Sequence, residues 1–262
     1  MIRHMQTQRT MTMSDKRHEP DSRAGWTLRH PGKFGTIVIR AKRDGTRGYH
    51  QKGGNQSTVD ADGVSLDIYV HALHGLALQR GKKVLMIGCA GGTLATMLAR
   101  GGRDVTVVDI DRQAFKLAKT YFYMPPEVSC RTGDGLRFME KVAARFDVVV
   151  VDAFIGEAIP AHFTGEAFFT AARRCVKRTG VILVNVCLHG RKDRLADEIA
   201  AGFEARGWGV KLLDEPGGAR NAVVAAGNVA GLRKPRVSMA PEVGAKKLKK
   251  GVNAMSFRAA LR

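Results

Sequence analysis

The sequence has little that would place the protein in a membrane or at a metal centre. None of its apolar runs approaches the roughly 18 residues that a membrane-spanning helix needs, and its first residues lack the apolar core of a secretory signal. The four cysteines are 41, 45 and 12 positions apart and form no C-x-x-C pair. This is not metal-site spacing, so we expect reduced thiols, no bound metal and a cytoplasmic protein.

Acidic residues are also scarce, since 43 Lys and Arg face 24 Asp and Glu for a net charge of +19. The excess is concentrated in residues 229–262, where nine basic residues face one acid, a net of +8. Their "RKPR" and "KKLKK" segments indicate either a weak contact with a polyanion such as nucleic acid or a solvated tail without a partner. We expect residues 1–25 and 229–262 to be disordered extensions. The tail has only Phe257 for stacking on bases, and nothing in it for chemistry.

Residues 26–79 are predicted to form a small strand-rich lobe that leads into a helix. "TIVIRAK" alternates between apolar and polar residues, "RDGTRGYH" contains an Asp-Gly turn signal, and "GGNQS" is expected to be a loop. "SLDIYVHALHGLAL" follows, with apolar residues at helical spacing.

Residues 80–228 alternate strand and helix patterns, which predicts a doubly wound α/β domain. We expect a mostly parallel, seven-stranded, Rossmann-like sheet of the class I methyltransferase type, because "VVVV" and "VILVNV" are apolar on both faces. Its predicted strands are Val84–Ile87, Val105–Val108, Val128–Arg131, Val148–Val151, Val181–Val186, Val210–Leu213 and a last one in "NAVVAAG". The predicted helices are Leu94–Arg100, Arg112–Tyr121, Leu136–Ala144, Glu166–Lys177 and Arg191–Arg206.

A glycine turn follows the first predicted strand of this domain, in "VLMIGCAGG", and ligands of such sheets lie beyond the carboxyl ends of the strands. Gly88 and Gly91 lie in the turn. Ala90 and Thr93 stand where a G-x-G-x-x-G fingerprint needs glycine, so a pyrophosphate-binding turn is not supported. A looser glycine turn still lets the backbone approach a nucleoside closely.

Three carboxylates follow the next strands. Asp109 is suited to accept hydrogen bonds from both ribose hydroxyls, and Asp134 to accept one from an adenine amino group. The alternative role of Asp109 and of Asp134 is to cap the N-terminus of the helix that follows. For the first of these helices Asp111 is the better candidate, because it directly precedes the helix. Asp152 directly follows four valines and is expected at the mouth of the cleft. Together these positions predict an S-adenosylmethionine-type site.

With these motifs, the chain resembles the spermidine synthase (polyamine aminopropyltransferase) family, in particular a divergent bacterial branch. The resemblance runs from about Pro31 to Gly227. The segments that carry it are "GGNQSTVD", the helix with Tyr69, "VLMIGCAGG", "VTVVDID", "RTGDGLRF", "FDVVVVDAF" and "GEAIPAHFTGEAFF".

The resemblance implies transfer of an aminopropyl group from decarboxylated S-adenosylmethionine to a small-molecule amine, by a homodimer. Asp152 would act on the amine as the catalytic residue, and Tyr69 would orient that amine. The residues expected to bind the nucleoside are Gln56, Gly88, Gly91, Asp109, Ile110, Asp134 and Gly135.

The chain also departs from the family, which leaves its function open. Ala90 and Ile155 stand where spermidine-forming members carry aspartates, and the late Tyr-Pro segment is not recognisable. Glu157 is either a substitute acid or a solvated loop residue. Two alternatives therefore remain: a methyltransferase that uses S-adenosylmethionine itself on an unknown substrate, and a non-catalytic protein that binds a nucleoside or a polyanion.

Overall fold

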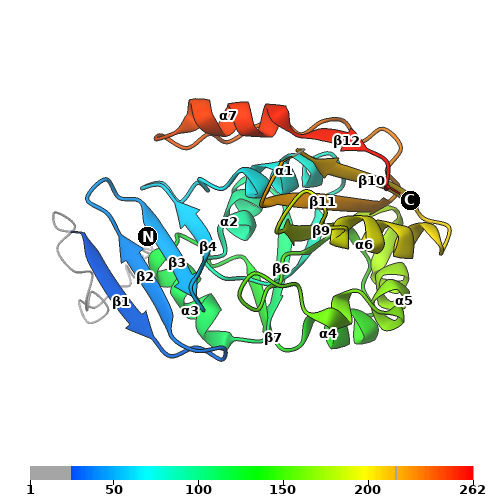
Figure 1. Cartoon of the computed structure of the whole chain (residues 1–262). Helices are drawn as coiled ribbons and strands as arrows, with labels where there is room; N and C mark the ends of the chain where they lie inside the picture. The colour runs from blue at the N-terminus through cyan, green and yellow to red at the C-terminus, as the bar shows by residue number, and fades with distance from the viewer. Residues whose placement is uncertain (1–24, 216, 262) are drawn as a thin grey trace, which may run out of the picture.

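The computed structural model describes residues 25–215 and 217–261, which form two sheets with helices around the larger one (Figure 1). The smaller sheet is antiparallel, in the order β1 (Trp26–His30), β2 (Ile37–Ala41), β3 (Arg47–Gln51) and β4 (Gly54–Val59). The prediction of a loop at "GGNQS" is wrong, because most of that segment pairs with β3. The apolar side of this sheet, which includes Ile39 and Tyr49, packs on Leu117 and Phe122 of the main domain.

The larger sheet has the strand order β12-β10-β11-β9-β8-β5-β6-β7 and confirms the α/β prediction. Its strands are β5 (Lys83–Ile87), β6 (Asp104–Asp109), β7 (Ser129–Thr132), β8 (Phe146–Val151), β9 (Val176–Leu188), β10 (Gly209–Asp214), β11 (Arg220–Gly227) and β12 (Ser256–Arg258). The five strands β5 to β9 pair in parallel, whereas β11, β10 and β12 add antiparallel pairings. The described sheet thus has eight strands rather than the predicted seven, because β12 joins it from the C-terminal segment.

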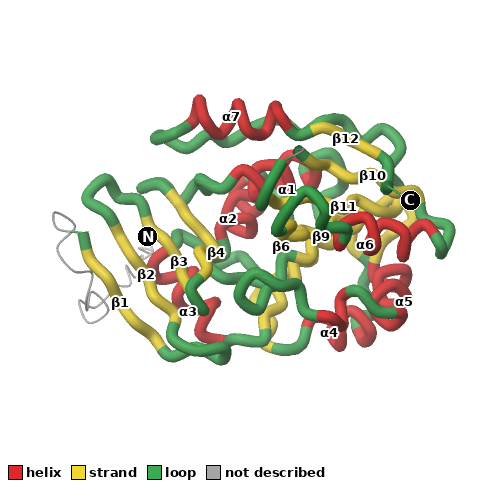
Figure 2. The backbone as a smooth tube through the Cα atoms, viewed as in Figure 1, coloured by secondary structure: helices red, strands yellow, loops and turns green. Residues whose placement is uncertain are grey.

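Helices cover both faces of this sheet (Figure 2). They are α1 (Ile68–Ala77), α2 (Thr93–Arg100), α3 (Arg112–Tyr121), α4 (Gly135–Lys141), α5 (Glu166–Cys175), α6 (Leu195–Glu204) and α7 (Ala245–Ala254). The four valines of β8 explain the arrangement: Val148 and Val150 face a core that includes α1 and α2, while Val149 and Val151 face α5 and α6. A central strand buried on both sides has to be apolar at every position. None of the described helices is long and apolar enough to span a bilayer.

Helix α6 begins four residues later than predicted. The carboxylate of Asp193 accepts hydrogen bonds from the backbone N–H groups of His189 and Leu195, which holds the preceding segment in a turn. The starts of the other predicted helices differ by one residue at most, while α4, α5 and α6 end earlier than predicted, at Lys141, Cys175 and Glu204.

The expectation of a disordered C-terminal tail differs from the structure. Leu248 and Val252 lie on one face of α7 and are buried, and a Cβ on Gly251 would lie 2.4 Å from the Ile68 side chain of α1. Strand β12 then pairs with β10. The tail is ordered because a short amphipathic helix finds a partner far away in the sequence. The predicted extension at residues 1–25 lies outside the described residues except for Gly25.

Candidate active site

A cavity of about 470 Å³ opens beyond the carboxyl ends of β5, β6 and β8, beside β4 of the small sheet. It brings together eight of the nine residues that the sequence singles out. The eight are Gln56, Tyr69, Gly88, Asp109, Ile110, Asp134, Gly135 and Asp152. Gly91, the ninth, does not line the cavity.

The glycine turn explains this difference. Gly88 has a φ of +98°, and a Cβ there would lie 2.1 Å from the carbonyl oxygen of Asp152, so only glycine fits. Gly91 instead donates its N–H to Ser57 Oγ at 3.2 Å, and a Cβ on it would lie 2.9 Å from the Ser57 side chain. Its lack of a side chain lets β4 approach the turn and does not make room for a ligand.

Asp109 is held in place by the backbone. One carboxylate oxygen accepts from Cys89 N and the other from Asp111 N, each at 2.7 Å. Burial raises the pKa of Asp109, and the two hydrogen bonds oppose that rise. A carboxylate oxygen has more than one acceptor site, so both can still receive hydroxyl groups from a ligand in the cavity. Asp111 is the N-cap of α3, as expected, and accepts from Gln113 N.

Asp134 is the N-cap of α4 and also lines the cavity. Its Oδ1 caps α4 by accepting from Arg137 N at 2.9 Å, and its Oδ2 lies 3.7 Å from Nε2 of His162 on the facing loop. Gly135 follows, where a Cβ would lie 2.2 Å from the Ile87 side chain. The lack of a side chain at Gly135 therefore lets the start of α4 pack closely on β5 beside Asp134.

Asp152 is a buried carboxylate of the cavity with a raised pKa. Burial, followed by the charge of Asp67, raises its pKa to about 6. Asn185 Nδ2 donates to Asp152 Oδ1 at 2.7 Å, and Asn221 Nδ2 donates to Asn185 Oδ1 at 3.1 Å. Because Asn221 occupies the amide oxygen of Asn185, the amide nitrogen has to face Asp152.

The sequence reasoning missed these two asparagines and Asp67. Asn185 was detectable as the polar residue inside the apolar run "VILVNV", and it is almost fully buried in β9. Asp67 precedes α1 like an N-cap but makes no capping hydrogen bond; it accepts from Thr58 N at 2.9 Å. Burial raises its pKa to about 6. Burial, and after it the charges of Asp152 and Asp67, raise the pKa of Tyr69.

The charge of the cavity is opposite to that of the protein as a whole. Five of its lining residues are acidic, and none of the described lining residues is Lys or Arg. They are Asp109, Asp111, Asp134, Asp152 and Glu157. Such a lining disfavours phosphate groups and favours a cationic ligand, because each charge interacts strongly in a partly desolvated site. Glu157 is mostly exposed on its loop, 3.7 Å from Nδ1 of His189, and Ile155 on the same loop is 38% exposed.

Comparison with known proteins finds similarity to polyamine aminopropyltransferases. The family model described as "Spermine/spermidine synthase domain" matches residues 67–192. A probable polyamine aminopropyl transferase of Bifidobacterium longum is 30% identical over 154 residues, which are 56% of this chain and 34% of that protein. The chain spans little more than a third of the length of the curated relatives it matches first.

Solved structures share the fold over most of the chain. A probable spermidine synthase from Corynebacterium glutamicum superimposes with a TM-score of 0.73 at 18% identity and covers 90% of this chain and 91% of that one. A spermidine synthase in complex with the transition state analogue AdoDATO reaches a TM-score of 0.59 at 17% identity, over 86% and 87% of the two chains. Residues 67–192 of this chain are therefore similar to the spermine/spermidine synthase domain, and the chain shares the fold of the solved spermidine synthases.

Proposed function

We propose that the protein transfers an aminopropyl group from decarboxylated S-adenosylmethionine to a small amine. The observation that carries this proposal is the convergence of Asp109, Asp134 and Asp152, from three strand ends, on one acidic cavity. Asp109 would hold the ribose and Asp134 the adenine. A spermidine synthase of the same fold, solved in complex with the transition state analogue AdoDATO, supports the proposed class of reaction.

The lining supports the decarboxylated form over S-adenosylmethionine itself. S-adenosylmethionine carries a carboxylate, which would enter a cavity that has five acids and, among its described lining, no Lys or Arg. The decarboxylated molecule carries only positive charges, on the sulfonium and the amine. Electrostatics alone therefore favours it.

The reaction would be an in-line displacement. The nitrogen lone pair of the acceptor attacks the carbon attached to the sulfonium, the C–S bond breaks with its electron pair moving to sulfur, and neutral methylthioadenosine leaves. The new secondary amine loses one proton. Because no negative charge develops on the leaving group, the enzyme mainly has to align the reactants and present an unprotonated amine.

Asp152 is suited to accept that proton. With a pKa of about 6 it is mostly ionised at neutral pH, yet it is more basic than an ordinary aspartate. Tyr69 lines the cavity on the side of Asp152 and would orient the acceptor. Ile155 supplies no second carboxylate, so Glu157 is the remaining acid on that loop for the far end of a diamine.

Calorimetric titration with three ligands tests the proposal: decarboxylated S-adenosylmethionine, methylthioadenosine and S-adenosylmethionine. Tighter binding of the first two is expected. Tighter binding of S-adenosylmethionine would favour a methyltransferase, and no binding of any of them would favour a non-catalytic protein. Release of methylthioadenosine in the presence of a panel of diamines then identifies the acceptor.

A further inference from the structure

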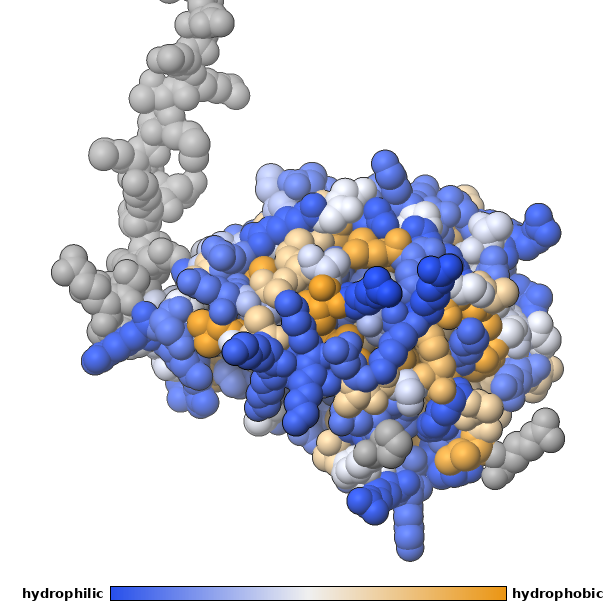
Figure 3. Space-filling model, turned by 90° about the horizontal axis from the view of Figure 1, so that it is seen from above, coloured by the Kyte–Doolittle hydropathy of each residue, from blue (hydrophilic) through white to orange (hydrophobic). Residues whose placement is uncertain are grey.

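The C-terminal segment places unpaired positive charge on one side of the molecule. We define the basic face as Arg233, Lys234, Arg236, Lys246, Lys247, Lys249 and Lys250. All seven are exposed. Figure 3, seen from the side of α7, shows long hydrophilic side chains projecting from this side. Within the part of the chain that the structure describes, none of the seven forms an ion pair with Asp or Glu.

The loop and the helix that carry these charges are held together. Lys234 Nζ donates to the carbonyl oxygen of Asn253 at the end of α7. The loop is fixed to the end of α1 by Gln79, which follows this helix, accepts from Arg233 N at 2.8 Å and donates to Arg233 O at 2.9 Å. The basic face is therefore a preformed surface and not a mobile arm.

The geometry of α7 directs its lysines outward. At 3.6 residues per turn, Leu248 and Val252 lie about 40° apart and face α1, while the four lysines spread over roughly 160° on the opposite side. Lys246 and Lys250 are four positions apart, and like charges at this spacing destabilise a helix. The first turn contains no acidic residue to complement the helix dipole. A bound polyanion would relieve both effects.

We propose that the basic face binds the phosphate backbone of duplex nucleic acid without sequence specificity. A lipid surface is disfavoured because the apolar face of α7 is buried against the protein, which leaves little to insert into a bilayer. Single-stranded nucleic acid is disfavoured as a ligand because proteins bind it by stacking its bases on exposed aromatic side chains. Phe257, the one aromatic residue of the segment, is partly buried beneath Lys211 Nζ, 5.2 Å from the ring centre.

Fluorescence anisotropy of the full chain with a labelled 20-base-pair DNA duplex tests this proposal. We compare the wild type with the variant K246Q/K247Q/K249Q/K250Q. The matched control is K42Q/K116Q/K141Q/K192Q, which removes the same charge from exposed lysines elsewhere on the protein. Circular dichroism checks that all three are folded.

With four phosphate contacts, affinity of the wild type should fall roughly 100-fold between 50 and 200 mM salt. The α7 variant should bind at least about tenfold more weakly at 50 mM salt and lose most of the salt dependence, whereas the control variant should keep both. Equal losses in the two variants would assign binding to the diffuse charge and overturn the proposal. So would absence of duplex binding at 50 mM salt, or binding of phosphatidylserine vesicles in its place. The result is independent of the ligand titrations of the cavity.

Discussion

At the scale of single residues, the burial of Asp152 raises its pKa and costs stability at neutral pH. Its pKa is about 6 in the folded protein against 3.8 for an ordinary aspartate, chiefly because it is desolvated. The protonated form is thus favoured by folding. The stability that this provides is fully present below about pH 4 and is lost as the pH rises through 6.

Replacing Asp152 with Asn should therefore separate stability from activity. At pH 7.5 the variant should unfold a few degrees higher, corresponding to about 1–3 kcal/mol for two pKa units, and the proposed aminopropyl transfer should be abolished. Nucleoside binding should remain nearly intact. Thermal unfolding, calorimetry and methylthioadenosine release measure the three effects, and a variant that turns over like the wild type would remove Asp152 from the mechanism.

Asn185 should set the pH at which activity is lost. Its hydrogen bond favours the charged form of Asp152, so N185A should raise the pKa of Asp152 and move the acid limb of kcat/KM upward by on the order of one pH unit. N221A should shift it less in the same direction. N253A, on the exposed side of α7, serves as the control. An unchanged acid limb in N185A would refute the positioning role.

Asp109 should contribute more to nucleoside binding than Asp111 does. We expect D109A to weaken binding of methylthioadenosine by about 1–3 kcal/mol, the scale for hydrogen bonds to a charged group. D111A removes the N-cap of α3 and should cost about 1 kcal/mol of stability with a smaller effect on binding. Calorimetry with both variants distinguishes them, and equal affinities would contradict the ribose assignment.

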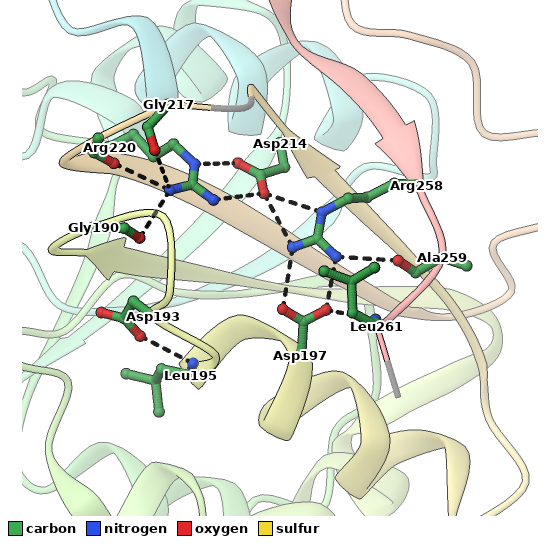
Figure 4. A network of polar contacts seen from close by, with 11 residues as sticks. Gly190, Asp193, Leu195, Asp197, Asp214, Gly217, Arg220, Arg258, Ala259 and Leu261 are labelled. Atoms are coloured by element: carbon green, nitrogen blue, oxygen red, sulfur yellow. Dashed lines mark hydrogen bonds and ion pairs between the residues drawn. The ribbon is translucent and has the colours of Figure 1, made fainter.

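At the scale of elements, the short strand β12 is held by a network of buried ion pairs (Figure 4). Arg258 donates to Asp197 on α6 at 2.7 Å and to Asp214 on β10, and both carboxylates are almost fully buried. Arg220 donates to Asp214 as well, at 2.7 Å. The arginines hold the pKa of both acids below the ordinary value, against the effect of burial. The C-terminal strand is thus tied to two elements that precede it by about 40 and 60 residues.

The variant R258A removes the guanidinium that pairs with the buried carboxylate of Asp197, and it should lower the free energy of unfolding by about 2–4 kcal/mol. The loss should be somewhat smaller than for a fully buried ion pair, because the Arg258 side chain is 25% exposed. K249A, which lies on the exposed side of α7, should change stability by less than about 0.5 kcal/mol. Since the depressed pKa values stabilise the fold above the unfolded pKa, the difference between the variants should shrink as the pH falls below 4. Urea unfolding at pH 7 and pH 3.5 measures this, and a constant difference would exclude the ionic origin.

At the scale of the whole molecule, charge is separated by sign. The net charge is +19, yet the described lining of the cavity holds acids and no Lys or Arg. The net positive charge repels a cation that comes within about 8 Å of the protein surface, which is the Debye length at physiological salt. The acids of the lining attract the cation once it has entered the cavity. The homodimer that the family resemblance implies stays a prediction. Light scattering should give twice the chain mass of 28.5 kDa, and a monomer at all concentrations would contradict it.

The parts of the fold that follow local rules were predictable. The four valines of β8 indicated a central strand, and Asp111 was recognisable as the N-cap of α3 because it directly precedes that helix. Because Asp109 and Asp134 come at the carboxyl ends of predicted strands, both were expected at the edge of the sheet where the cavity lies. Gly91 was not predictable, because whether a glycine makes room for a ligand or for a neighbouring strand depends on packing with distant residues.

Local pattern by itself determined the α/β class, the acidic strand ends and the excess of basic residues near the C-terminus, since each depends on neighbours within a few positions. Only the tertiary structure decided that Asn221 orients Asn185, that Asp67 raises the pKa of Asp152, and that the basic tail folds against α1. These contacts join segments that lie far apart in the chain. Their energies depend on burial and distance, and neither exists until the strands have paired.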